Sequence, residues 1–256
     1  FVPSVTIKDA PRFGWRGMQM DFSRHFFSLD NVKTFLDYMA LYKLNTYHMH
    51  LTDDQGWRVE IKKYPLLTEK GAWRIESSHD RECNELAKTD PSFIIDEQHY
   101  HDRDGQRMYG GFFTQEQIKE IINYAAARNI EVIPEIDMPG HFKSAIDNYP
   151  YLSCTGEAGW GEHFSIPACL GRETSYEFAK DILTEIAELF PSEYIHIGGD
   201  EVDTTAWTTC AKCQNAIKEN NLKNEHELQS FFNKDIEKFL HTKGKRLIGW
   251  DEIVDG

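Results

Sequence analysis

Strand-like and helix-like segments alternate along this chain, and the alternation restricts its fold more than any other feature. Short runs rich in β-branched and aromatic residues are each followed by a longer stretch with apolar residues at helical spacing. Repeated strand–helix units are typical of α/β folds built on a parallel sheet. We predict five strands, at residues 16–22, 45–51, 130–136, 194–197 and 246–250.

Helical patterns fall between these strands. Asp30-Asn31 and Thr174 are expected N-caps, and Pro191 follows the third helix as a stop signal. The predicted helices span residues 29–42, 114–128, 174–190, 208–220 and 225–242.

The number of strand–helix units bears on the architecture. A (β/α)8 TIM barrel has eight strands, whereas five units with long insertions use all 256 residues. We therefore expect one barrel domain over residues 1–256, truncated after about the fifth strand, with the C-terminal part of the barrel missing from this chain. Two connections, residues 52–111 and 149–172, are long enough to shape a pocket on the barrel rim.

Charge excludes some classes of partner. The chain carries 42 acidic and 28 basic residues, a net charge of −14, which argues against nucleic acid or an anionic membrane surface as partner. The apolar runs are far shorter than the roughly 18 residues of a membrane span.

Five cysteines leave the redox compartment open. Cys210 and Cys213 form a C-x-x-C pair in a helix-like segment, with no second pair at zinc spacing, so a local disulfide or two reduced thiols is favoured over a structural metal. Cys154 and Cys169 flank one loop and could be bridged if the protein is exported.

The fourth predicted strand ends in a potential reactive site. Gly198-Gly199 lets the backbone bend and approach a ligand closely, and Asp200 and Glu201 follow directly. In a parallel barrel the carboxyl ends of the strands form the active-site rim, so adjacent acids there indicate a catalytic pair. Consecutive strand residues face opposite sides, so the bend has to turn both carboxylates toward one pocket.

Polar or ionisable side chains also follow the other predicted strands. They are Asp21, Arg24 and His25 after the first, Asp53, Asp54 and Gln55 after the second, Asp137 and His141 after the third, and Trp250, Asp251 and Glu252 after the fifth. Their convergence on one rim predicts a single site.

Five ordered motifs closely resemble the catalytic domain of the family 20 glycoside hydrolases, the β-N-acetylhexosaminidases. They are MDFSRHF at 20–26, HLTDDQGWR at 50–58, PEIDMPGH at 134–141, HIGGDEV at 196–202 and GWDE at 249–252. The resemblance covers essentially the whole chain. It implies an exo-acting enzyme that removes terminal GlcNAc or GalNAc from a glycan or glycoconjugate.

The resemblance also implies a mechanism and roles. The 2-acetamido oxygen of the substrate attacks the anomeric carbon and gives an oxazolinium intermediate, while Glu201 acts as general acid and then as base. Asp200 would orient the acetamido group and stabilise the developing positive charge. Arg24 would bind sugar hydroxyls with its fork of donors, and Trp250 would stack on the sugar ring.

Asp53, Asp137 and His141 would form a polar network that holds Glu201 and lines the pocket, with Asp54 as an alternative to Asp53. The resemblance requires no metal or cofactor. It favours a secreted, periplasmic or lysosome-like compartment and allows a homodimer.

Two rival functions stay open at this point. A non-catalytic glycan-binding module or inert barrel fragment is one, although such a chain would be expected to lose Asp200 or Glu201. The other is a metal-dependent barrel hydrolase, in which His48 and His50, on one face of the second strand, bind a metal with His141 and Asp200.

Overall fold

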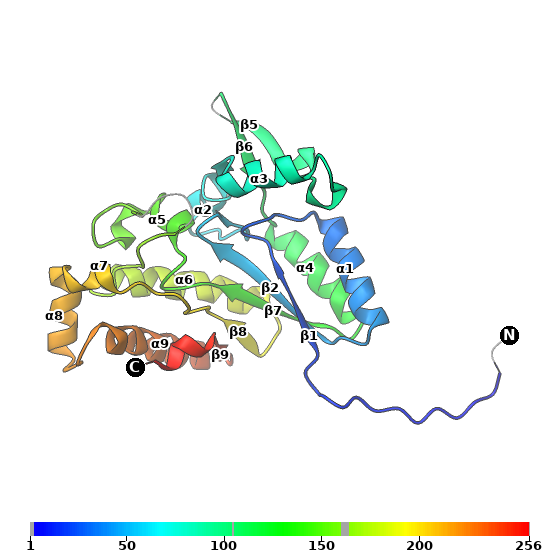
Figure 1. Ribbon diagram of the computed structural model, residues 1–256. Coiled ribbons are helices and arrows are strands. Elements are labelled where there is room, and N and C mark those ends of the chain that lie inside the picture. Colours follow the sequence, from blue (N-terminus) through cyan, green and yellow to red (C-terminus); the bar gives the residue numbers. More distant parts are fainter. Residues whose placement is uncertain (1–2, 104, 160–163, 256) are drawn as a thin grey trace.

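The computed structural model describes residues 3–103, 105–159 and 164–255. Five parallel strands lie side by side in chain order, as Figure 1 shows. They are β1 (Gly17–Asp21), β2 (Thr46–Asp53), β7 (Glu131–Ile136), β8 (Tyr194–His196) and β9 (Arg246–Ile248). All five predicted strands are present, and each pairs in parallel with its neighbour. The predicted α/β architecture with a parallel sheet is thereby confirmed, with five parallel strands in the described part of the chain.

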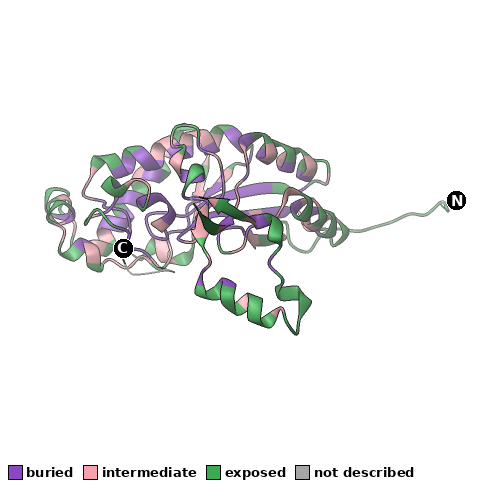
Figure 2. Ribbon diagram, turned by 90° about the horizontal axis from the view of Figure 1, so that it is seen from above, coloured by how far each residue is buried: buried purple, intermediate pink, exposed green. Residues whose placement is uncertain are grey.

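Long helices connect these strands and cover the sheet. They are α1 (Leu29–Leu41), α4 (Gln115–Ala126), α6 (Glu173–Leu189) and α9 (Glu225–Thr242). Each turns an apolar face to the strands, so the buried residues concentrate between the helices and the sheet in Figure 2. The buried side chains on these faces include Val32, Leu36, Ile118, Ile121, Ile182, Ile186, Phe232 and Ile236.

Three details of the helices differ from the predictions. The N-cap of α1 is Ser28, whose side chain accepts the Asn31 N–H while the Asn31 side chain accepts the Ser28 N–H. Arg172, and not Thr174, precedes α6. The helix predicted at 208–220 begins later, as α8 (Ala211–Glu219), because Cys210 adopts an extended backbone conformation; a separate short helix, α7 (Thr205–Thr208), precedes it.

The connection after β2 folds into a small unit of its own. It contains β3 (Gly56–Trp57), α2 (Leu66–Glu69), β4 (Trp73–Ile75), α3 (Ser78–Leu86), the 3-10 turns Pro91–Phe93 and Glu97–His99, β5 (Tyr100–Arg103) and β6 (Gln106–Gly110). Strands β4, β6 and β5 form an antiparallel sheet that projects from the barrel (Figures 1 and 2).

Arg58 fixes this unit to the barrel. Its side chain is completely buried, and its guanidinium donates to the backbone carbonyls of Phe22 (3.0 Å), Ser23 (2.7 Å) and Ala72. These carbonyls belong to the end of β1 and to the start of the antiparallel sheet. A single cation therefore joins the two parts of the fold.

The second connection, 149–172, follows α5 (Lys143–Ile146) and contains the 3-10 turn Pro150–Leu152; its residues 160–163 lie outside the described part. A last 3-10 turn, Asp251–Val254, follows β9. Within the described residues, none of the helices combines the length and apolar character needed to cross a membrane.

Candidate active site

The bend after β8 turns the two adjacent acids off the strand. Gly198 and Gly199 have φ of 65° and 85°, and Glu201 has φ of 48°. A Cβ on Gly198 would lie 2.0 Å from Asp137 Oδ1, so this position requires glycine for space as well as for its conformation.

Both acids reach one atom of a third residue. Asp200 Oδ2 lies 3.6 Å from His141 Nε2, and Glu201 Oε2 lies 3.5 Å from the same nitrogen. The Asp200 side chain is 23% exposed and the Glu201 side chain 65% exposed. The structure thus brings together a shielded carboxylate, an accessible one and an imidazole at the carboxyl rim of the sheet.

His141 carries a positive charge at this point. Its Nδ1 lies 3.1 Å from Asp53 Oδ1 and 3.5 Å from Asp54 Oδ2. Burial by itself would lower the pKa of His141, but the hydrogen bonds to Asp53 and Asp54 outweigh it and raise the pKa to about 11. An imidazolium therefore faces Asp200 and Glu201 near neutral pH.

Asp53 connects His141 to the rest of the site. Its Oδ2 lies 2.8 Å from Arg24 Nη1 and 2.9 Å from His50 Nε2. Burial would raise the pKa of Asp53, but hydrogen bonds from His141 and His50 hold it well below its usual range. Asp54, whose Oδ2 approaches the same nitrogen of His141, also accepts the Lys143 backbone N–H at 2.9 Å through its Oδ1.

Arg24 combines an anchored and an accessible part. Its Nη1 pairs with Asp21 Oδ2 at 2.9 Å as well as with Asp53, and its side chain is 44% exposed. Arg24 therefore has a structural role, because it forms ion pairs with both Asp21 and Asp53. The exposure leaves the guanidinium accessible at the rim.

Asp137 is buried beside the bend. Its Oδ1 accepts the Gly199 N–H at 3.2 Å, and its own N–H donates to Thr52 Oγ1 at 3.0 Å. Burial, together with the negative charge of Asp200, raises the pKa of Asp137 well above its usual value. This residue supports the turn that presents Asp200.

Glu135 is a central residue of the site that the sequence did not single out. It is fully buried, and its Oε2 lies 2.7 Å from His48 Nε2 and 2.8 Å from His50 Nδ1. Its Oε1 lies 3.2 Å from His196 Nδ1 and accepts the Trp250 Nε1–H at 3.0 Å. The available signal was alternation: Glu135 lies on β7 two residues before Asp137, and β7 pairs with the histidine-bearing strand β2.

Trp250 packs against the histidines that surround Glu135 and also reaches the surface. Its ring packs at 4.9 Å from His196 and at 5.9 Å from His48, and the residue is 36% exposed. Glu135 fixes the indole through its N–H. The tryptophan is therefore held in place while part of its ring stays accessible.

The histidines do not assemble the metal site of the rival hypothesis. His48 groups with Glu135 and His196, His50 groups with Glu135 and Asp137, and His141 groups with Asp53 and Asp54 or with Asp137 and Asp200. The predicted set of His48, His50, His141 and Asp200 is not one of the groups that the described residues form.

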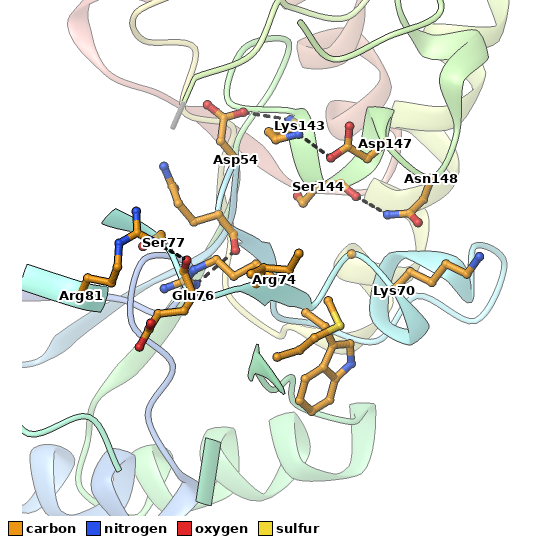
Figure 3. A pocket seen from close by; sticks show the side chains of 15 residues that line it. Asp54, Lys70, Arg74, Glu76, Ser77, Arg81, Lys143, Ser144, Asp147 and Asn148 are labelled. Atoms are coloured by element: carbon orange, nitrogen blue, oxygen red, sulfur yellow. Dashed lines mark hydrogen bonds and ion pairs between the residues drawn. The ribbon is translucent and has the colours of Figure 1, made fainter. Parts of the chain in front are cut away.

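A cleft of about 620 Å³ opens next to the rim, between α5 and the unit that carries the antiparallel sheet. Figure 3 shows Asp54 and Lys143 on one side and Arg74, Glu76 and Arg81 on the other. Asp54 is shared between this cleft and the His141 network. The long connection 52–111 therefore shapes a hollow beside the candidate site, as its length indicated.

Comparisons with known proteins agree on one family. The model of "Glycosyl hydrolase family 20, catalytic domain" matches residues 13–256. A beta-hexosaminidase of Porphyromonas gingivalis is 45% identical over 260 residues, covering 100% of this chain and 30% of that protein. A beta-hexosaminidase of Vibrio furnissii is 42% identical over 263 residues, covering 100% of this chain and 40% of that protein.

A solved structure gives the same result. The GH20 exo β-N-acetylglucosaminidase of Vibrio harveyi, in complex with N-acetylglucosamine, superposes with a TM-score of 0.80 at 40% identity, over 97% of this chain and 37% of that chain. The chain thus spans less than half the length of these relatives.

Proposed function

Because this chain belongs to glycosyl hydrolase family 20, we propose that it serves in the exo-hydrolysis of terminal, non-reducing β-linked N-acetylhexosamine, GlcNAc or GalNAc. The observation that carries the proposal is the approach of Asp200 and Glu201 to the same nitrogen of His141. Of two adjacent acidic groups beside one cation, one can act as the general acid while the other stabilises developing positive charge.

In the proposed reaction the substrate supplies the nucleophile. Its acetamido oxygen attacks C1 while Glu201 donates a proton to the glycosidic oxygen, and the leaving group departs as an alcohol. Glu201 then removes a proton from the water that opens the oxazolinium ring and restores the acetamido group. The exposure of Glu201 suits a residue that has to reach both the leaving group and water.

Asp200 is suited to the acetamido group. It is mostly shielded, and its Oδ1 is buried without a hydrogen-bond partner among the described residues. A substrate N–H would satisfy that oxygen and place the acetamido oxygen near C1. The carboxylate would also stabilise the positive charge that spreads over the ring in the intermediate.

His141 sets the charge balance of this pair. As an imidazolium held by Asp53 and Asp54, it would offset the repulsion between the Asp200 and Glu201 carboxylates once Glu201 has given its proton to the leaving group. Arg24 and Trp250 are accessible on the same rim and would bind hydroxyls and the apolar face of the sugar, respectively.

The test compares three substrates of the purified protein. We expect release of 4-nitrophenol from its N-acetyl-β-glucosaminide, little release from the β-glucoside with a 2-hydroxyl, and slower release as the acetamido methyl is fluorinated, because fluorine weakens the carbonyl nucleophile. Glu201→Gln and Asp200→Asn should each lower kcat by about 10²–10⁴, whereas Glu219→Gln on the exposed face of α8 should not.

Equal rates with the glucoside would refute substrate assistance. No release from any sugar, with tight binding of GlcNAc, would favour the glycan-binding alternative.

A further inference from the structure

Four of the five cysteines meet at one point away from the candidate active site. Cys154 and Cys169 come from the connection 149–172, and Cys210 and Cys213 from the beginning of α8. Their ligand atoms all lie within 4.8 Å of one another. We call these four residues the cysteine cluster.

The spacing within the cysteine cluster is that of ligands around a common ion. The Sγ atoms of Cys154 and Cys213 are 3.7 Å apart, those of Cys169 and Cys213 are 3.7 Å apart, and those of Cys169 and Cys210 are 3.8 Å apart. Zn–S bonds of about 2.3 Å place sulfur atoms at tetrahedral corners about 3.8 Å apart. A disulfide would instead bring two sulfurs to about 2.05 Å.

The surrounding fold is built to hold these thiols close. Cys169 and Cys213 are completely buried, and Cys154 and Cys210 are half-buried. A Cβ on Gly171 would lie 2.2 Å from the carbonyl carbon of Lys212 and 2.3 Å from the nitrogen of Cys213. Only glycine lets this loop approach the first turn of α8 so closely.

The disulfide considered between Cys154 and Cys169 is not formed. All five cysteines are free thiols, and both loop cysteines lie at contact distance from Cys213. The sequence suggested no zinc site because Cys154 and Cys169 are too far apart along the chain to form a second C-x-x-C pair. The fold brings them together with Cys210 and Cys213.

We propose that the cysteine cluster binds one Zn²⁺ as four thiolates. Four sulfur ligands complete a tetrahedral shell and leave no position for water or substrate, which is the pattern of a structural site. Tetrahedral sulfur sets select zinc or iron among the common metals. We assign zinc because, unlike iron, it is not redox-active and so requires no redox partner.

The position of the ion gives it a role in the fold. Cys169 follows Ala168, whose N–H donates to the Pro139 carbonyl at 2.8 Å and whose carbonyl accepts the Trp207 Nε1–H at 3.0 Å. Pro139 begins the turn that carries His141, and Trp207 lies on the segment that follows Glu201. A zinc ion would therefore fasten the two loops on which the candidate catalytic groups stand.

The experiment measures metal and thiols on the tag-free protein, purified under reducing conditions without chelator. We expect one zinc per chain by elemental analysis. Mercurial titration should release that zinc as four thiols react. Exchange with Co²⁺ should give the intense visible and thiolate charge-transfer bands of tetrahedral CoS4 coordination.

Cys210→Ser tests the cysteine cluster at a half-buried ligand, and Cys83→Ser, a half-buried cysteine on α3, is the matched control. The ligand variant should lose most of its zinc and the cobalt bands, whereas the control should keep both. If Cys210→Ser does not fold, the wild-type cobalt spectrum and the thiol-linked zinc release decide instead.

Three results would overturn the proposal. They are reduced wild-type protein that takes up neither zinc nor cobalt, four thiols that are found as two disulfides in protein purified under reducing conditions, and one bound iron with the visible spectrum of an iron–thiolate site. Besides these three results for the wild-type protein, zinc that stays bound in Cys210→Ser at the wild-type ratio would place the ion elsewhere and overturn the proposal too.

Discussion

Glu135→Gln is the substitution that tests most directly how the site is held together. The carboxylate is fully buried and faces three histidines and the indole N–H of Trp250. Burial would raise the pKa of Glu135, but the hydrogen bonds of His196, His48 and His50 keep it well below its usual range. The ionised form is therefore the one that the surrounding donors stabilise.

The size of the effect follows from what glutamine cannot replace. The glutamine side chain has only one acceptor oxygen, so its NH₂ group has to face some of the histidine and indole donors that Glu135 now accepts. The negative charge next to His50 is also lost. Removing one partner from a buried charge pair costs about 3–5 kcal/mol. For a chain of this length that corresponds to a fall in Tm of about 6–20 °C.

Thermal and urea unfolding of Glu135→Gln measure this loss against Glu131→Gln, an exposed glutamate at the start of the same strand. The control should change stability by about 0.5 kcal/mol or less. Equal stability of the two variants would show that the Glu135 network contributes no net free energy and would refute the reasoning.

Three further predictions follow from single residues. His141→Gln should lower stability most below pH 6.5, and the difference from wild type should shrink as pH rises toward about 11, because the pKa of His141 is raised on folding; urea titrations across pH measure it. Gly198→Ala should lower the unfolding free energy by about 2–4 kcal/mol through left-handed strain and steric overlap, whereas Gly105→Ala, with φ of 76° and open space, should cost about 1–2 kcal/mol. Arg58→Lys should cost about 3 kcal/mol, because buried carbonyls lose charged donors, while exposed Arg81→Lys should leave the urea midpoint nearly unchanged.

The sequence alone determined the parallel sheet and the rim position of the acids. The strands are short runs rich in β-branched and aromatic residues, and these runs stand out from the longer amphipathic helices between them. The glycine pair and the two acids after Ile197 are contiguous in the chain, and their chemistry can be recognised without knowing what surrounds them.

Only the tertiary structure decided the interactions that cross between strands. Glu135 meets His48 and His50 because parallel pairing places β7 beside β2 in a particular register, which local pattern does not specify. The N-cap of α1 depended on which of several capping residues in 28–31 adopts extended backbone. The cysteine cluster joins residues of the connection 149–172 to residues at the beginning of α8, and their spacing along the chain does not predict that they are close in space. The sequence therefore specified the local structure, whereas the packing of the barrel determined which residues far apart in the chain come into contact.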